Sequence, residues 1–117
     1  MTLRFKIGQY AEISHSFSTE AVQQFSRVST DVNPIHIDDS YAKESIFGEK
    51  IVHGMLVGSL FSSLIANKLP GPGSVYLKQD LNFKKPVYHN QKVIARVEIK
   101  NIREDNQIVE LYTVCLD

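Results

Sequence analysis

Several features that would place a chain of 117 residues in a special class are missing from this sequence. Net charge is missing, because 13 basic residues balance 13 acidic ones, whereas electrostatic binders of nucleic acid usually carry a clear basic excess. Its single cysteine, Cys115, cannot form an intramolecular disulfide, which suits a reducing compartment. We therefore expect no nucleic-acid partner, and we interpret Cys115 as a small core residue.

Long apolar runs are missing as well. The main apolar run, residues 51–66, is interrupted by glycines, serines and His53, whereas a membrane span needs about 20 mostly apolar residues. The first residues also lack the apolar stretch of a secretory signal. We expect a single cytoplasmic domain over residues 1–117, with no membrane segment.

The periodicity of the apolar residues predicts an α+β fold. A strand is expected over Tyr10–Phe17, and Ser18 is a typical N-cap for a helix over Thr19–Ser29 with an apolar stripe. That stripe would consist of Val22, Phe25 and Val28. A short helix near Asp39–Glu44 and a buried helix over Gly54–Asn67 should follow.

Alternating apolar residues in the last third of the chain predict strands over residues 75–83, 93–99 and 108–116. The third run is apolar on both faces, so we expect it in the interior of the sheet. A sheet wrapped around the apolar helix is the simplest architecture for this order of elements.

Residues 30–50 are polar and rich in turn formers, and loops of this length without a role are uncommon. Here Pro34 restricts the backbone around it, and Asn33 can close a local turn. A rigid turn that carries Asp31 and His36 suits proton transfer: Asp31 would accept a proton from water, and His36 would supply or relay another. The alternative is a turn-forming aspartate beside an ordinary histidine.

Metal binding is another use for such residues, and the spacing does not support it. A calcium loop starting at Asp31 would have Ile35 at a ligand position and His36 in place of the turn glycine. A zinc site formed by His36, His53 and Asp38 or Asp39 lacks a supporting motif. We predict no metal and no cofactor.

The start of the buried helix is the second candidate feature. The amides of Gly54 and Met55 would lack intrahelical partners and could bind an oxyanion. The alternative is a glycine that permits close packing. Small residues continue along the same stripe of the helix, which either forms the floor of a narrow apolar pocket or packs closely on a sheet. The stripe consists of Gly54, Gly58, Ser62 and Ile65.

The stretches Asp31-x-Asn33-Pro34-x-His36-x-Asp38 and Ile51-Val52-His53-Gly54-Met55 together resemble the signature of the MaoC-like, (R)-specific enoyl-CoA hydratases (hydratase 2). The resemblance covers nearly the whole chain. It implies a hot-dog fold, in which an antiparallel sheet wraps around a long central helix, usually in a homodimer. Family members normally continue with a further strand, so we expect one strand of the family to be absent here.

The family's reaction is the reversible syn addition of water to a trans-2-enoyl-CoA, which gives the (R)-3-hydroxyacyl-CoA. The resemblance implies this activity on short to medium acyl chains, without a cofactor, in fatty-acid or polyhydroxyalkanoate metabolism. A hot-dog thioesterase and a non-catalytic acyl-CoA-binding module remain the alternatives.

The resemblance also implies roles for individual residues. Asp31 and His36 would activate the water, and the amide of Gly54 would bind the thioester oxygen. Other positions would contact the substrate or the phosphates of CoA: Asn33, Met55, Ser62 and Ile65 the substrate, Lys84 and Lys85 the phosphates.

Overall fold

The structure is a computed structural model that describes residues 4–117. Its elements are, in chain order, β1 (Tyr10–Ser16), α1 (Thr19–Ser29), α2 (Pro34–Ile37), α3 (Asp39–Lys43), α4 (Gly54–Asn67), β2 (Lys92–Arg103) and β3 (Ile108–Leu116). The chain divides into two compact units. We call residues 4–14, 60–79 and 94–116 the sheet unit, and residues 15–59 and 80–93, with Asp117, the helical unit.

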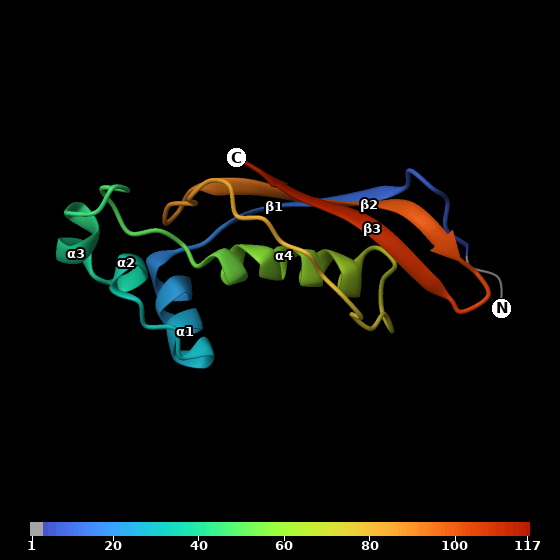
Figure 1. Cartoon of the computed structure of the whole chain (residues 1–117), viewed down its shortest axis with the longest axis horizontal. Helices are drawn as coiled ribbons and strands as arrows, with labels where there is room; N and C mark the ends of the chain where they lie inside the picture. The colour runs from blue at the N-terminus through green and yellow to red at the C-terminus, as the bar shows by residue number, and fades with distance from the viewer. Residues whose placement is uncertain (1–3) are drawn as a thin grey trace. The chain divides into compact units, whose positions relative to one another are not determined.

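The sheet unit is organised around its central strand, because the strand order is β1-β2-β3. Strands β2 and β3 pair antiparallel, with Ile94 opposite Leu116 and Arg103 opposite Ile108. Alternate residues of β2 point to one face, and those on its buried face, Val93, Ala95, Val97 and Ile99, are almost fully inaccessible. The last turns of α4 lie along the strands (Figure 1) and supply the buried Leu60, Phe61 and Leu64 to this unit.

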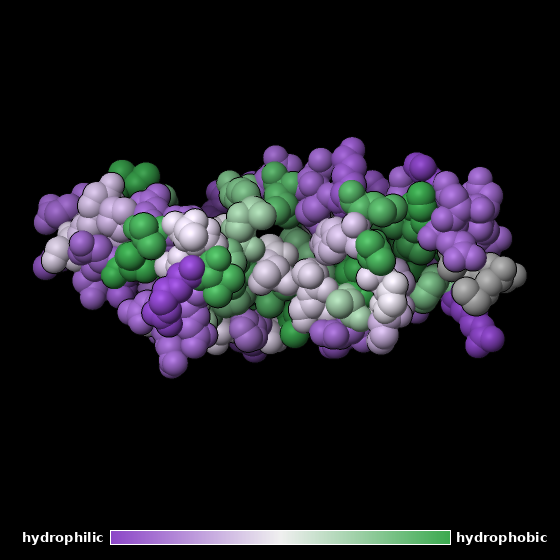
Figure 2. Space-filling model, turned by 90° about the horizontal axis from the view of Figure 1, so that it is seen from below, coloured by the Kyte–Doolittle hydropathy of each residue, from purple (hydrophilic) through white to green (hydrophobic). Residues whose placement is uncertain are grey.

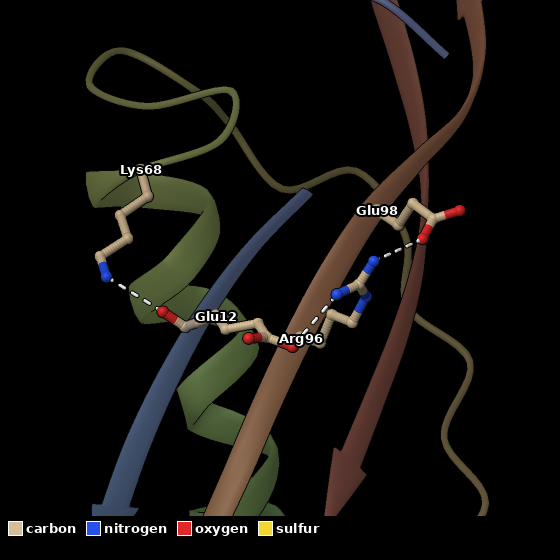
Figure 3. Close-up of polar contacts among 4 residues, drawn as sticks. All are labelled: Glu12, Lys68, Arg96 and Glu98. Carbon is tan, nitrogen blue, oxygen red and sulfur yellow. Dashed lines mark hydrogen bonds and ion pairs between the residues drawn. The ribbon is translucent and has the colours of Figure 1, made fainter. Parts of the chain in front are cut away.

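A polar network joins the outer side of β2 to β1, and β1 to Lys68, the residue that follows α4 (Figure 3). Arg96 donates to the Glu12 carboxylate at 3.1 Å and to the Glu98 carboxylate at 3.0 Å, and its guanidinium lies 3.7 Å from the centre of the Tyr10 ring. Lys68 donates from Nζ to the carbonyl of Glu12 at 3.0 Å. Exposed ion pairs contribute little to stability, so burial along β2 dominates the stability of this unit.

The helical unit begins with α1, and the expected N-cap is confirmed, because Ser18 Oγ accepts from the amide of Ala21 at 3.1 Å. The buried side of α1 contains Val22 and Ser26, with Phe25 half-buried. The prediction that Val28 belongs to this buried stripe is wrong, because Val28 is 83% exposed. Ser26 takes its place because it lies one helical turn after Val22 and finds a hydrogen-bond partner inside.

The bounds of α1, α4 and β3 agree with the sequence analysis, and β1, α3 and β2 differ from it only at their ends. Helix α2 was not expected: it is four residues long, too short for an apolar period to indicate it. Cys115, expected as a core residue, is half-buried in β3. No helix in the described part of the chain has the length and apolar character needed to cross a membrane.

The strand expected over residues 75–83 is wrong, since these residues form no strand in the described chain. Alternation indicates two different faces, but a strand also needs a backbone neighbour. Side chains hold this segment instead: Gln79 donates to Thr113 Oγ1 at 3.1 Å and accepts from the Tyr76 hydroxyl at 2.7 Å. Val75 and Leu77 stay exposed, and apolar side chains reach the surface on the face drawn in Figure 2.

The interior position expected for β3 is also wrong. In the described chain β3 is the outermost strand on its side of the sheet, and Tyr112 and Leu116 are exposed. Apolar residues on both faces of a strand indicate that both faces of the sheet are covered. They do not indicate whether the strand has a hydrogen-bonded neighbour on each side.

We predict that Ile99→Ala lowers the free energy of unfolding by about 2–5 kcal/mol, because Ile99 is fully buried (0% exposed) and its loss leaves a cavity. The matched control is Ile46→Ala, since Ile46 is 96% exposed and should change stability by no more than about 0.5 kcal/mol. Urea unfolding followed by circular dichroism measures both. Equal losses in the two variants would contradict the assignment of the core to β2.

Candidate active site

The turn before α2 orients the carboxylate of Asp31. Its Oδ1 accepts from the amide of Asn33 at 3.1 Å, and Asn33 Oδ1 in turn accepts from the amide of Ile35 at 3.2 Å. The local turn expected at Asn33 is therefore confirmed, and Asn33 is the N-cap of α2. The second oxygen of Asp31 has no partner within residues 4–117, and the side of the turn that carries it is exposed.

The imidazole of His36 is held by one buried hydrogen bond. Its Nδ1 lies 2.8 Å from the carbonyl oxygen of Ile51, and the residue is only 8% exposed. Because a carbonyl can only accept, Nδ1 carries the proton. In the neutral ring Nε2 is then the unprotonated nitrogen, which can bind or accept a proton from water.

His53 completes the site and is 2% exposed. Its Nε2 lies 3.1 Å from Ser26 Oγ and 3.2 Å from the carbonyl oxygen of Asp31, and its ring stacks on that of His36 with centres 3.9 Å apart. Burial lowers the pKa of His53, against the hydrogen bond to Asp31, and the nearby His36 lowers the pKa further. His53 is thus kept neutral.

A carboxylate oxygen of Asp31 and one nitrogen each of His36 and His53 lie within 4.8 Å of one another. These donors suit a metal ion by type but not by geometry, because the lone pair of an imidazole lies in the plane of its ring. The two rings are inclined by only 27° at 3.9 Å, so their planes meet far from both rings. A single ion could not lie in both planes at bonding distance.

The other aspartates weighed for a zinc site have separate structural roles. Asp38 Oδ1 accepts from the amide of Tyr41 at 3.1 Å and caps α3, and Asp39 pairs with Lys50 at 3.3 Å. The structure therefore brings together Asp31, His36 and His53, rather than a set that includes Asp38 or Asp39.

Gly54 opens α4, and its amide makes no hydrogen bond within the described residues, as is normal for the first turn of a helix. A Cβ at this position would lie 2.8 Å from two atoms of the Phe83 ring, so a larger residue requires this exposed ring to move. The close contact favours a glycine here, and the binding of an oxyanion to its amide stays a prediction.

The remaining predicted contact residues lie in both units. Met55 is exposed on α4, and Lys84 and Lys85 are exposed beside Phe83. Ser62 and Ile65 belong to the sheet unit rather than to the helical unit that contains the Asp31–His36 pair. Their roles in substrate binding stay predictions.

The sequence analysis missed two residues of the site and gave His53 only the role of a possible metal ligand. Ser26 bonds to His53, and Phe83 covers Gly54. A serine one turn after the buried Val22 was the available signal for Ser26, since a polar side chain on an apolar stripe needs a partner. Nothing local indicated Phe83.

The sheet with one long helix, α4, and the Asp31–His36 pair at the turn into α2 are the features to compare with known proteins. The comparison identifies the family. The model of the MaoC like domain matches residues 5–115. The chain belongs to the MaoC-like family.

Individual relatives agree with this family assignment. The chain is 45% identical over 108 residues to the (R)-specific enoyl-CoA hydratase of Aeromonas caviae, covering 92% of this chain and 81% of that one. It is 34% identical to the enzyme of the same name from Rhodospirillum rubrum, covering 94% and 76%. The solved structure of the A. caviae (R)-hydratase involved in PHA biosynthesis superposes with a TM-score of 0.94 at 44% identity, covering 96% and 85%. The hot-dog fold is confirmed.

We predict that the free energy of unfolding decreases as the pH falls through 6.5. Burial lowers the pKa of both His53 and His89 from 6.5, and Lys50 lowers that of His89 further. Below pH 6.5 the unfolded chain therefore binds more protons than the folded chain, and stability is lost down to the lowered pKa values. Urea unfolding between about pH 7.5 and pH 5 measures this.

A His89→Gln variant tests the contribution of His89, whose Nδ1 lies 3.0 Å from Thr19 Oγ1. It should show a weaker pH dependence than the wild-type chain, because one of the two titrating groups is gone. Stability that is independent of pH over this range in the wild-type chain would contradict the prediction.

Proposed function

We propose that the chain catalyses the reversible, (R)-specific hydration of trans-2-enoyl-CoA thioesters to (R)-3-hydroxyacyl-CoA, a hydro-lyase reaction. The observation that carries the proposal is the pair formed by Asp31 and His36. Each is held by one hydrogen bond to or from the main chain, and each keeps one atom available for a reacting water. Similarity to the A. caviae and R. rubrum hydratases supports the same activity.

The separation within the pair suits a single water molecule. A carboxylate oxygen of Asp31 and a nitrogen of His36 lie within 4.8 Å. A water that donates hydrogen bonds of about 2.8 Å to two acceptors holds them roughly 4.5 Å apart. Its lone pair then points away from both groups and toward the β-carbon (C3) of the enoyl thioester.

Attack of this water forms the C3–O bond and breaks one O–H bond, and Asp31 accepts the proton. The electron pair of the C2–C3 double bond moves toward the thioester, and the Asp31–His36 pair then returns one proton to C2. The pair ends the turnover in the protonation state in which it began. Because one pair serves both carbons, the hydroxyl and the hydrogen arrive on the same face of the substrate, which gives syn addition.

Negative charge develops on the thioester oxygen during the attack. The amide of Gly54 lies at the positive end of α4 and would donate to this oxygen. One donor of this kind contributes about 10²–10³ to the rate. The chemistry requires no metal ion and no cofactor.

Finer properties belong to the same proposal. We propose short to medium acyl chains with contacts from Asn33, Met55, Ser62 and Ile65, and CoA phosphates bound by Lys84 and Lys85, which are exposed beside Phe83. The active form would be a cytoplasmic homodimer, in fatty-acid or polyhydroxyalkanoate metabolism. The A. caviae structure comes from a protein described as involved in PHA biosynthesis.

We predict that Asp31→Asn lowers kcat by about 10²–10⁴, because the proton acceptor is lost while an amide can keep the turn to Asn33. Asp38→Asn is the matched control: it changes the same functional group seven residues along the chain, where the side chain only caps α3. Loss of the enoyl-thioester absorbance of crotonyl-CoA measures kcat, and an (R)-specific dehydrogenase checks the product.

The outcomes separate the proposal from its alternatives. Unchanged kcat in Asp31→Asn would remove Asp31 from the mechanism. Release of free CoA would indicate a thioesterase. Binding of a non-hydratable acyl-CoA in calorimetry, with no turnover by the folded wild-type chain, would indicate a binding module.

We also predict that dialysis against EDTA leaves kcat unchanged within about twofold, since the stacked rings of His36 and His53 cannot share an ion. Adding back Zn²⁺, Mg²⁺ or Mn²⁺ to the dialysed protein should not raise the rate. Activity that disappears with EDTA and returns with one of these ions would overturn the metal-free mechanism.

A further inference from the structure

We propose that His53 is a positioning residue for the Asp31–His36 pair, fixing the turn of Asp31 through its main chain and the ring of His36 by stacking. The proposal rests on the proposed function, because the pair it positions is the one assigned to hydration. His53 contacts both Asp31 and His36. It is buried, so it has no direct access to a substrate.

The first contact fixes the main chain of the catalytic turn. Nε2 of His53 lies 3.2 Å from the carbonyl oxygen of Asp31, and since a carbonyl only accepts, Nε2 is the donor. Ser26 Oγ, on α1, lies 3.1 Å from the same nitrogen. Thus Asp31 is held twice: its carboxylate by the amide of Asn33 and its carbonyl by His53.

The other ring nitrogen supports this assignment of the proton. Nδ1 of His53 is buried and has no hydrogen-bond partner within residues 4–117. With the proton on Nε2, Nδ1 is only an unpaired acceptor, whereas a proton on Nδ1 would bury an unpaired N–H, which costs more. The same argument opposes a doubly protonated, cationic ring.

The second contact fixes the ring of His36. The His53 ring stacks on it at 3.9 Å, and Phe25 meets the His53 ring edge-on at 4.9 Å. The His53 ring is confined by these neighbours from α1 and α2. The stack, together with the bond from His36 Nδ1 to Ile51, therefore determines where Nε2 of His36 lies.

His53 also leads directly into the start of α4. Its carbonyl accepts from the amides of Leu56 at 3.0 Å and Val57 at 3.1 Å, and the next residue in the chain is Gly54. His53 thus connects the turn of Asp31, the ring of His36 and the Gly54 amide that we propose binds the thioester oxygen. A shift of about 1 Å in such a group can cost 10²-fold in rate.

Two substitutions separate the hydrogen bond from simple filling of space. His53→Phe keeps an aromatic ring against His36 and Phe25 but loses the donor to Asp31. His53→Gln keeps an N–H donor at the place of Nε2. We expect kcat to fall about 10- to 100-fold in His53→Phe with KM within about threefold, and kcat to recover at least fivefold in His53→Gln.

His15→Phe is the matched control, because it makes the same change at an exposed histidine whose ring lies 4.8 Å from that of Phe17. Its kcat should stay within about threefold of the wild-type value. Wild-type kcat in His53→Phe, or a His53→Gln variant no better than His53→Phe, would overturn the proposal. If His53→Phe does not fold, His53→Leu replaces it, because leucine also lacks the donor and is smaller. The same fall in kcat is expected, and wild-type kcat in His53→Leu would overturn the proposal.

A readout that is independent of catalysis distinguishes this proposal from the proposed function. The amide of Asn33 donates to Asp31 Oδ1, so its hydrogen exchange reports the turn in the absence of substrate. We expect exchange at least about tenfold faster in His53→Phe than in His53→Gln or the wild-type chain. Unchanged exchange refutes positioning by His53, whereas a wild-type chain without hydratase activity refutes the proposed function alone.

Discussion

The hydrogen bond from His36 Nδ1 to the carbonyl of Ile51, at 2.8 Å, is the interaction on which the rest of the site depends. It selects the tautomer of His36, and it joins α2 to the segment that leads into α4. The amide of Ile51 returns a bond to the carbonyl of Ile35 at 3.2 Å, and the amide of Val52 bonds to Val87 at 2.7 Å. Residues 51–52 thus hold α2 on one side and residues 87–88 on the other, so a displacement at any of the three segments would move the imidazole.

The site achieves this order at a cost in stability. His53 Nδ1 and His89 Nε2 are both buried without a hydrogen-bond partner in the described chain, and an unpaired buried polar atom costs about 1–3 kcal/mol. Both atoms belong to histidines whose pKa burial lowers, so the same desolvation that costs stability keeps these rings neutral. A neutral His53 places no positive charge beside the imidazole of His36.

The sequence predicted those parts of the site that depend on local chemistry. Asp31 and His36 were found because Pro34 and Asn33 determine the shape of the turn between them within a few residues, and Ser18 was found because an N-cap acts over three residues. His53 reaches its partners across 22 residues to Asp31 and 27 residues to Ser26, and no local pattern carries that information. The expected strand over residues 75–83 failed for the same reason, since a ladder requires a neighbour that the segment itself does not supply.

The two explanations for Gly54, close packing and oxyanion binding, do not exclude each other. The ring of Phe83 lies 2.8 Å from the position that a Cβ of Gly54 would take, and Leu81 lies 3.4 Å from the corresponding position at Gly58, so both glycines of the small-residue stripe have close neighbours. A Cβ projects from the side of a helix, whereas the first amides point along the axis out of its N-terminal end. Phe83 therefore contacts the flank of α4, and the Gly54 amide points in a different direction. The contact favours a glycine, and the amide without an intrahelical partner is the donor that we propose for the thioester oxygen.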